Sequence, residues 1–316
     1  MKLETRNPDR PIGILLLAFG GPNSLDDVGP FLENIFPGRP LSPALIDQVR
    51  ERYRLIGGKS PLLKITERQA QSLKHSLLKA RRVIEVYTGM RHWHPYIQET
   101  FKTMGGKGVK KVLCLILSPY SSRATAEGYK DAVQTAIKNS TKKIEVNFVP
   151  SCHTNPICID AVFEKVKAGL DLFPSHRQPY VQIIFTGHSL PQTAVKNDPY
   201  VDQIHATISS VMQRFKNNDG HLAFQSRGRG NGEWLSPDVE DVLKVLAKSG
   251  KVEVLVVPLG FVSDHLETLH DLDIILRKKA WDLGLNFQRS PSLNDSPKFI
   301  EALTDIVLKS LDQEPS

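Results

Sequence analysis

Residues 110–119 read Lys110-Lys111-Val112-Leu113-Cys114-Leu115-Ile116-Leu117-Ser118-Pro119, an apolar run that follows two lysines and stops at a proline. A second segment, Lys251-Val252-Glu253-Val254-Leu255-Val256-Val257-Pro258, has nearly the same pattern. Short apolar runs of this kind, bounded by turn residues, are typical of buried strands in a parallel sheet. The two segments therefore predict equivalent strands in two related α/β domains, a duplication joined near residue 150.

Further apolar runs recur along the chain, separated by stretches with helical periodicity. The expected strands are Ile12–Phe19, Val83–Tyr87, Val112–Leu117, Ile144–Val149, Val181–Phe185, Leu222–Gln225 and Val252–Val257. The expected helices are Ser24–Ile35, Pro43–Leu55, Ile65–Ala80, Pro95–Met104, Thr125–Lys138, Pro156–Leu170, Tyr200–Phe215, Pro237–Lys248, Asp264–Leu283 and Ser296–Leu311. Strand alternating with helix indicates parallel sheets covered on both faces. The cleft between two such domains is the natural place for a ligand.

Composition excludes several classes of protein. With 40% hydrophobic and 24% charged residues, the chain is neither disordered nor fibrous. The apolar run from Ile14 to Phe19 is far shorter than the roughly 20 residues that span a bilayer, and it lacks a signal-peptide cleavage pattern. We therefore expect a cytoplasmic protein.

The net charge of +7 favours an anionic partner. The basic residues are spread along the chain instead of forming a stripe, so nucleic acid is not the expected partner. The three cysteines cannot build a disulfide framework for a chain of this length. Cys152-His153 with Cys158 is at most half of a metal site, because the chain has no second ligand pair with zinc spacing.

His188 follows a five-residue apolar stretch, in the segment Thr186-Gly187-His188-Ser189-Leu190-Pro191. Ligands bind at the carboxyl ends of parallel strands, so an imidazole at such an end is placed for chemistry. On its own, His188 is more often a capping or core histidine than a base or a metal ligand. Downstream, Val252–Val257 runs into Pro258–Glu267. Two strand ends would then face one crevice with a histidine and a glutamate.

Glu267 allows two interpretations. Asp264 and Glu267 have the spacing of a capping box, in which the glutamate reaches back to the start of its helix. Glu267, His270 and Asp271 also have the spacing i, i+3, i+4 and share one face of a helix. Such a face is either a lane for a divalent cation or a solvated charged stripe.

The segment Gly57-Gly58-Lys59-Ser60-Pro61-Leu62 predicts a helix start with Ser60 as N-cap and Pro61 at N1. The free backbone N–H groups there can also hold a carboxylate. Neither a P-loop nor a dinucleotide fingerprint is present, so nucleotide cofactors are unsupported. Aromatic and basic side chains that could clasp a flat anionic ligand occur at strand ends or in loops: Phe19, Arg52, Tyr53, Arg91, Tyr120, Tyr129 and Trp234.

Together, the motifs resemble the ferrochelatase family in content and in order. They are Leu17-Ala18-Phe19-Gly20-Gly21-Pro22, Arg52-Tyr53-x-x-Ile56-Gly57-Gly58-x-Ser60-Pro61-Leu62, Gly89-Met90-Arg91-His92-x-His94-Pro95, His188-Ser189-Leu190-Pro191, Asp198-Pro199-Tyr200, Gln225-Ser226, Trp234-Leu235 and Ser263-Asp264-His265-x-Glu267-Thr268-Leu269-x-x-Leu272-Asp273. Each motif alone is only modestly specific, but the whole set in this order is strong evidence for the resemblance.

The resemblance implies two Rossmann-like domains with the active-site cleft between them. These are residues 1–150, completed by a C-terminal helix at 295–316, and residues 151–294. It implies a lyase of haem biosynthesis that inserts Fe²⁺ into a porphyrin, with His188 and Glu267 as the catalytic pair. The implied porphyrin contacts are Phe19, Arg52, Tyr53, Ser60, Tyr129 and Trp234, and the candidate metal ligands are His188, Glu267, His270 and Asp271. Which of His188 and Glu267 takes the protons stays open.

The short spacing between Gly20-Gly21-Pro22 and Arg52-Tyr53 resembles the coproporphyrin-using branch, so coproporphyrin III is favoured over protoporphyrin IX. Phe19 and Phe36 depart from that branch: a tyrosine that ligates the product iron is common at the first position, and an arginine that grips a propionate at the second. A non-catalytic tetrapyrrole or haem carrier is therefore one alternative. A chelatase for another metal or tetrapyrrole is the other.

Iron is expected as substrate, with no permanently bound cofactor. Some relatives hold an iron–sulfur cluster on C-terminal cysteines, but no cysteine follows Cys158, and so no cluster is expected. We expect a monomer without a nucleic-acid partner and without stable membrane insertion.

Overall fold

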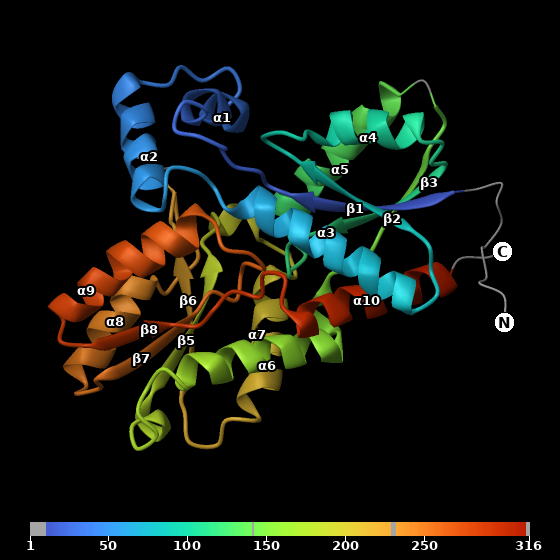
Figure 1. The fold of residues 1–316 in the computed structure, drawn as a ribbon. Coiled ribbons are helices and arrows are strands. Elements are labelled where there is room, and N and C mark those ends of the chain that lie inside the picture. The colour runs from blue at the N-terminus through green and yellow to red at the C-terminus, as the bar shows by residue number, and fades with distance from the viewer. Residues whose placement is uncertain (1–10, 141, 229–231, 314–316) are drawn as a thin grey trace. The chain divides into compact units, whose positions relative to one another are not determined.

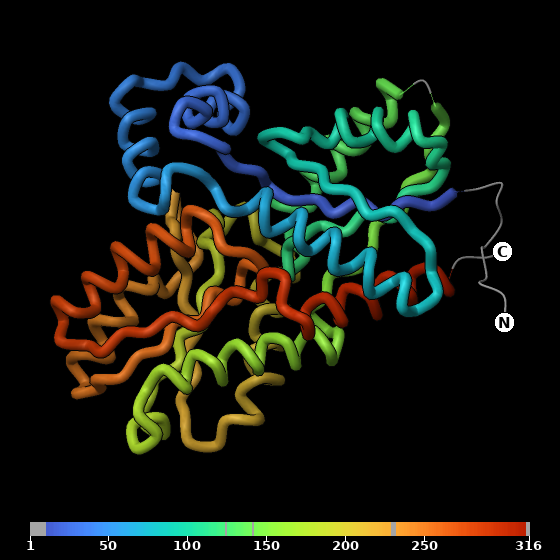
Figure 2. The backbone as a smooth tube through the Cα atoms, in the orientation of Figure 1, coloured from blue at the N-terminus to red at the C-terminus, as the bar shows by residue number. Residues whose placement is uncertain are grey.

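The computed structural model describes residues 11–140, 142–228 and 232–313 (Figures 1 and 2). The chain divides into two compact units. Within the described residues, the first unit holds 11–117, 125–140, 142–151 and 294–313, and the second holds 118–124, 152–228 and 232–293. Residues 118–124 thus belong to the second unit, although they fall inside the predicted domain 1–150.

The first unit contains a parallel sheet of four strands in the order β2-β1-β3-β4. The strands are β1 (Ile12–Ala18), β2 (Glu85–Met90), β3 (Lys111–Ile116) and β4 (Glu145–Phe148). In the central strand β1, Ile14, Leu15, Leu16 and Leu17 are completely buried. Burial on both faces explains why β1 is a continuous apolar run without alternation.

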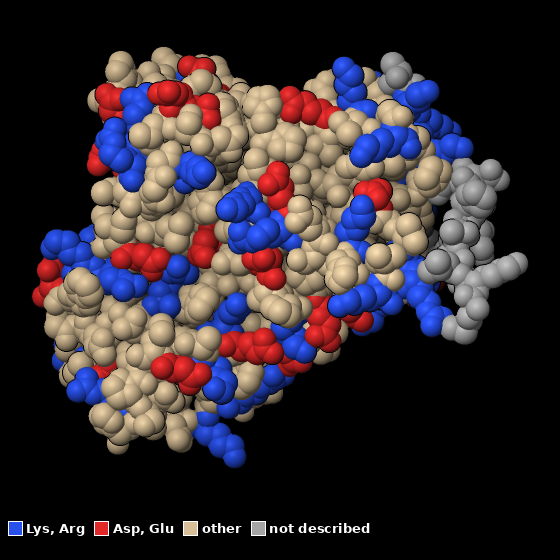
Figure 3. All heavy atoms as spheres, viewed as in Figure 1, with Lys and Arg blue, Asp and Glu red and all other residues tan. Residues whose placement is uncertain are grey.

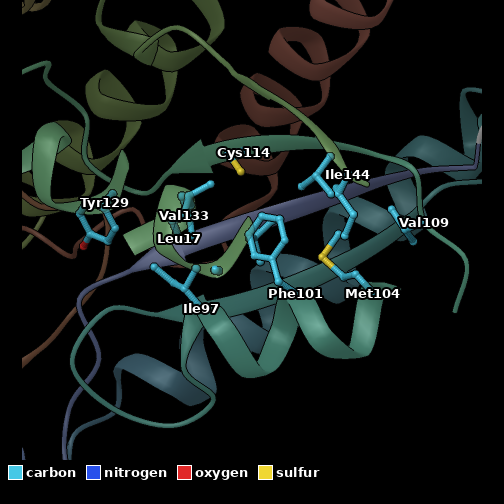
Figure 4. Packing of buried hydrophobic residues seen from close by; sticks show 12 residues of the cluster. Leu17, Ile97, Phe101, Met104, Val109, Cys114, Tyr129, Val133 and Ile144 are labelled. Carbon is cyan, nitrogen blue, oxygen red and sulfur yellow. The ribbon is translucent and has the colours of Figure 1, made fainter. Parts of the chain in front are cut away.

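Helices cover both faces of this sheet (Figure 1). They are α3 (Leu62–Lys79), α4 (Ile97–Gly106) and α5 (Arg123–Lys138). Of the other helices of this unit, α10 (Pro297–Asp312) packs on α3, and α1 (Val28–Ile35) and α2 (Pro43–Leu55) pack against each other. Figure 4 shows Phe101 and Met104 of α4 and Val133 of α5 packing with Leu17 of β1 in one apolar cluster. α10 packs against α3, where Thr304 Oγ1 donates a hydrogen bond to Ser76 Oγ at 2.9 Å.

The second unit repeats this plan with a parallel sheet in the order β6-β5-β7-β8. Its strands are β5 (Gln182–His188), β6 (Gly220–Gln225), β7 (Glu253–Val257) and β8 (Asn286–Arg289). Its helices are α6 (Pro156–Leu170), α7 (Tyr200–Met212), α8 (Val239–Lys248), the π-helix η4 (Glu267–Leu276), α9 (Arg277–Asp282) and the short 3₁₀-helices η1 (Cys152–Thr154), η2 (Gln178–Tyr180) and η3 (Gln192–Ala194). Two parallel four-stranded sheets flanked by helices confirm the predicted fold class.

Two elements of the second unit differ from the sequence prediction. Strand β8 was not predicted, because Phe287 is the one apolar residue among its four; the ring is buried and β8 pairs with β7 at the edge of the sheet. The single helix predicted over Asp264–Leu283 is a π-helix from Glu267 to Leu276 followed by the short α-helix α9. Apolar periodicity indicates a helix, but it does not register the wider π turn, which often marks a functional site.

No helix in the described part of the chain combines the length and apolar character needed to cross a membrane. On the face that Figure 3 shows, lysine and arginine side chains intermingle with aspartate and glutamate. This face has no stripe of one charge sign, in agreement with the spread of basic residues along the sequence.

Candidate active site

His188 is the last residue of β5, so its imidazole stands at the carboxyl end of the second sheet. The backbone around it is held from two directions. Ser189 N donates a hydrogen bond to Gln225 O at 2.8 Å, and the Tyr200 hydroxyl donates to His188 O at 3.1 Å. These two bonds fix the backbone at the end of the strand, from which the imidazole projects.

Glu267 is brought to His188 by the loop that follows β7. Gly260 N donates a hydrogen bond to Thr186 O at 2.8 Å, which places the loop directly against the end of β5. A β-carbon on Gly260 would lie 2.9 Å from Gly187 Cα and 3.2 Å from His188 N. Only glycine permits this approach without displacing backbone.

We expect Gly260→Ala to destabilise the protein by about 1–3 kcal/mol, because the new β-carbon meets backbone atoms that cannot rotate away. The measurement is the free energy of unfolding from urea titration. Gly106→Ala is the matched control: Gly106 ends α4, and its β-carbon would meet nothing within 4 Å. Alanine there should be neutral or slightly stabilising. Equal stability of the two variants would contradict the close contact.

The start of η4 is clamped by Arg289 of β8. Its guanidinium donates two hydrogen bonds to the carboxylate of Asp273, at 2.7 and 2.8 Å, and one to Asp264 Oδ1 at 3.2 Å. Bidentate arginine–carboxylate pairs of this kind fix geometry strongly. The unpredicted strand thus positions the helix that carries Glu267.

The side chains of His188 and Glu267 meet: Nδ1 of the imidazole lies 2.9 Å from Oε2 of the carboxylate. The exposed fractions of the two side chains are 35% and 27%, so a bound ligand can reach both. The capping-box interpretation of Glu267 was wrong. Instead of reaching back to the start of its helix, the carboxylate engages the histidine, while Thr268 Oγ1 accepts the hydrogen bond from His265 N.

The pair shifts the pKa of both members. Burial alone would lower the pKa of His188, but the charge of Glu267, the hydrogen bond to it and the charge of Asp271 together raise it above 6.5. Burial alone would raise the pKa of Glu267, but the charge of His188 and the hydrogen bond to it, helped by His265 and Ser226, lower it to about 2. Each shift favours the charged form of its group, so the contact stabilises an imidazolium–carboxylate pair against its neutral form.

Aromatic and polar side chains surround this pair. The ring of Phe261 lies edge-on to the imidazole of His188, with 6.2 Å between the ring centres. It also packs against the imidazole of His265, with 4.4 Å between the ring centres. Burial lowers the pKa of His265, which favours a neutral imidazole beside the charged pair. Ser226 has a left-handed backbone with φ of 57°, and its hydroxyl donates a hydrogen bond to Asp271 Oδ2 at 3.2 Å. Phe261 was not predicted as a site residue, because a lone phenylalanine in a loop carries no distinct signal.

The three side chains predicted to line one helix face for a cation, Glu267, His270 and Asp271, belong to two separate pairs. Glu267 faces His188, whereas His270 is buried with its Nδ1 2.8 Å from Asp271 Oδ1. Within the described residues, no three histidine, cysteine, aspartate or glutamate side chains are grouped so that they could hold a metal ion. The candidate metal ligands thus do not form a preassembled cage.

The predicted porphyrin contacts differ in exposure. Five lie in the first unit (Phe19, Arg52, Tyr53, Ser60 and Tyr129) and Trp234 lies in the second. Phe19 is 42% exposed, with its ring 4.5 Å from His92, and Arg52 and Trp234 are half-buried.

The other three side chains are buried. Tyr53 lies inside α2, and Tyr129 belongs to the apolar cluster of Figure 4, with the Arg91 guanidinium 5.7 Å from its ring centre. Ser60 Oγ accepts a hydrogen bond from Leu62 N at 3.3 Å, at the start of α3. The helix begins at Leu62, so Pro61 and not Ser60 is the N-cap residue. The observed contacts give Ser60 and Tyr129 structural roles, and Tyr53 is buried in the fold.

The ferrochelatase family model matches residues 11–311, which is nearly the whole chain. The chain belongs to the ferrochelatase family. It is 40% identical over 315 residues to a ferrochelatase of Geobacter metallireducens, covering 94% of this chain and 98% of that protein. It is 34% identical over 308 residues to a ferrochelatase of Deinococcus radiodurans, covering 96% and 98%.

Two solved structures share the fold at 13% sequence identity. One is SirB from Bacillus subtilis with Fe³⁺, with a TM-score of 0.59 and coverage of 96% of this chain and 98% of that one. The other is the sirohydrochlorin chelatase SirB from Bacillus subtilis subspecies spizizenii in complex with cobalt, with a TM-score of 0.56 and coverage of 96% of each chain. At this identity, the similarity concerns the fold alone. Membership of the ferrochelatase family itself supports metal insertion into a porphyrin in haem biosynthesis.

Proposed function

We propose that this chain inserts Fe²⁺ into coproporphyrin III, with His188 and Glu267 as its catalytic pair. One observation carries the proposal. In a chain of the ferrochelatase family, a partly exposed imidazole lies 2.9 Å from a partly exposed carboxylate at the carboxyl end of a parallel sheet. This is the place where open α/β sheets bind ligands.

Metal insertion requires two pyrrole protons to leave the porphyrin and a hydrated dication to lose water. Because Nδ1 of His188 faces Glu267, Nε2 is the ring nitrogen left to accept a pyrrole proton. The proton can pass on to Glu267 or to solvent, and the imidazole is then ready for the second proton. Glu267 also offers carboxylate oxygens to the incoming cation. His188 as base and Glu267 as proton relay and iron contact is the division of roles that the geometry favours.

This mechanism predicts that activity rises with pH through the pKa of His188. Only neutral imidazole accepts a proton, and the raised pKa keeps His188 protonated at pH values where a free imidazole is already neutral. The profile of kcat/KM against pH should therefore have its lower midpoint above 6.5. Asp271→Asn should move this midpoint to lower pH, because the charge of Asp271 helps to raise the pKa of His188. A rate that falls as pH rises through this range would contradict His188 as the base.

The net charge of +7 supports coproporphyrin III, which has four carboxylates. The test is an anaerobic panel that crosses Fe²⁺, Co²⁺ and Zn²⁺ with coproporphyrin III, protoporphyrin IX and sirohydrochlorin. The highest kcat/KM is expected for Fe²⁺ with coproporphyrin III. Faster reaction with protoporphyrin IX would contradict coproporphyrin III as the substrate. Preference for Co²⁺ with sirohydrochlorin would contradict insertion of Fe²⁺ into a porphyrin as the reaction. Binding without turnover would favour a carrier.

We further propose that iron is only a substrate, that no iron–sulfur cluster is present and that the protein works as a monomer. The second statement is supported by the sequence, which has no cysteine after Cys158. Assays of iron and labile sulfide on anaerobically purified protein test the first two statements, and light scattering during size-exclusion chromatography tests the third.

A further inference from the structure

Cys152 and Cys158 lie side by side in the second unit, outside the catalytic pair. Cys152 opens η1, and Cys158 lies in the first turn of α6. Neither is in a disulfide, and their Sγ atoms are 2.8 Å apart. This separation exceeds the S–S bond length of about 2.05 Å by less than an ångström. A small shift would therefore bring the two sulfur atoms to bonding distance.

The backbone between the two cysteines holds them in this position. Asn155 N donates a hydrogen bond to Cys152 O at 3.0 Å. The side chain of the same residue caps α6, with Oδ1 accepting from Ile157 N at 2.9 Å and Cys158 N at 3.2 Å. Asn155 thus fixes the backbone of both cysteines through one turn.

Both thiols line a small cavity of about 30 Å³ in the second unit. The exposed fractions of Cys152 and Cys158 are only 7% and 4%. The hydroxyl of Ser290, on the same cavity wall, is buried and has no hydrogen-bond partner among the described residues. Roughly 10–15 Å³ suffices for a water molecule, so a small polar molecule fits into the cavity. The thiol of another protein is too large to enter it.

We propose that Cys152 and Cys158 are an oxidation site at which hydrogen peroxide forms an intramolecular disulfide. The Cys152 thiolate attacks one peroxide oxygen, so that an S–O bond forms, the O–O bond breaks and hydroxide leaves. The sulfur of Cys158 then attacks the sulfenic acid, forming the S–S bond, and the second oxygen leaves as water with the thiol proton. In total, two thiols and one peroxide become one disulfide and two waters.

The hydrogen bond between the thiols assigns the order of attack. Cys158 donates its S–H to Cys152 Sγ. This bond, together with burial, raises the pKa of Cys158, so that Cys158 keeps its proton. Cys152 is therefore the sulfur that attacks first, and Cys158 resolves the sulfenic acid.

The wall of the cavity connects this site to the catalytic pair. Phe261 lines the cavity, and its ring also contacts His188 and His265. When the two sulfur atoms draw together, we expect the side chains that share the cavity to repack around them. We expect this repacking to alter the setting of His188, an effect that rests on the proposed function.

Mass spectrometry tests the disulfide directly. Trypsin releases residues 144–165 as one peptide that holds both cysteines, while Cys114 lies in the separate peptide 112–123. After peroxide treatment, denaturation and alkylation, peptide 144–165 should carry no label and be lighter by two hydrogen atoms than its dithiol form. Reduction before alkylation should restore both labels, and Cys114, buried in β3, should be labelled throughout. Two labels on peptide 144–165 after oxidation, or added oxygen without an S–S bond, would overturn the proposal.

Single serine variants test the order of attack. In Cys158→Ser, peroxide should leave a sulfenic acid on Cys152 that a dimedone probe captures. In Cys152→Ser, Cys158 should take up little probe. Equal capture in both variants would overturn the assigned order, and circular dichroism checks that both variants keep the wild-type fold.

Activity tests the connection to His188. Oxidised wild-type protein, freed of peroxide, should insert iron at least about twofold more slowly than reduced protein and recover with a dithiol reductant. Cys158→Ser should respond less than wild type. If the disulfide forms and the rate is unchanged, the connection through Phe261 is wrong. If reduced protein inserts no metal, the proposed function fails, while the mass measurement still decides on the disulfide.

Discussion

Replacing His188 by alanine should lower kcat/KM for metal insertion by about 100- to 10,000-fold, the range that a general base contributes. Among the described residues, no other imidazole is hydrogen-bonded to Glu267, so the pyrrole protons would have to leave through water. The substitution opens no core cavity, because the imidazole is 35% exposed. The measurement is the initial rate of Fe²⁺ insertion under anaerobic conditions, with circular dichroism to show that the fold is retained.

His221→Ala is the matched control for this experiment. His221 stands on β6 of the same sheet, and its Nε2 lies 3.0 Å from Gln182 Oε1, away from Glu267. Its loss should leave the rate near that of wild type. Free imidazole in the buffer should partly restore the rate of His188→Ala and not change that of His221→Ala. Full activity in His188→Ala would reject the mechanism.

Glu267→Gln should have the second-largest effect, a loss of about 100-fold or more, because glutamine neither relays a proton nor neutralises a dication. The variant should also change the remaining activity in a specific way. Without the carboxylate charge, the pKa of His188 falls, since burial then acts with less opposition. The lower midpoint of the kcat/KM profile should therefore move to lower pH even as the plateau drops.

The same variant should alter the dependence of stability on pH. The lowered pKa of Glu267 contributes stability that is present above its ordinary 4.5 and is lost as pH falls towards about 2. The raised pKa of His188 contributes stability that is present below 6.5 and is lost as pH rises through the folded-state pKa. The pair thus stabilises the protein most between pH 4.5 and pH 6.5, where both contributions are present.

Urea titrations at pH 3, 5.5 and 8 should show a maximum near the middle value for wild type and a flatter profile for Glu267→Gln. Glu240→Gln is the control, because Glu240 lies on α8 and pairs with Lys279 instead of a histidine. A Glu267→Gln profile identical to that of wild type would show that the pair adds no stability.

Local sequence was sufficient for most of the fold. Seven apolar runs predicted seven of the eight described strands, and the signal is clearest in β1 and β7, which are buried on both faces. The exceptions, β8 and η4, have a common cause. A four-residue edge strand with one buried side chain, Phe287, has no periodic signal, and the width of a helical turn is set by what the helix packs against.

For the site, the sequence by itself determined the residue types and their place at strand ends: His188 closing one apolar run and Glu267 following another. Only tertiary structure decided that these side chains, 79 positions apart, lie 2.9 Å from each other. That distance depends on contacts between remote segments, namely Gly260 against Gly187 and Arg289 holding Asp264 and Asp273. Tertiary packing likewise buried Tyr53, Ser60 and Tyr129, because the exposure of a side chain is a property of its neighbours and not of its own identity.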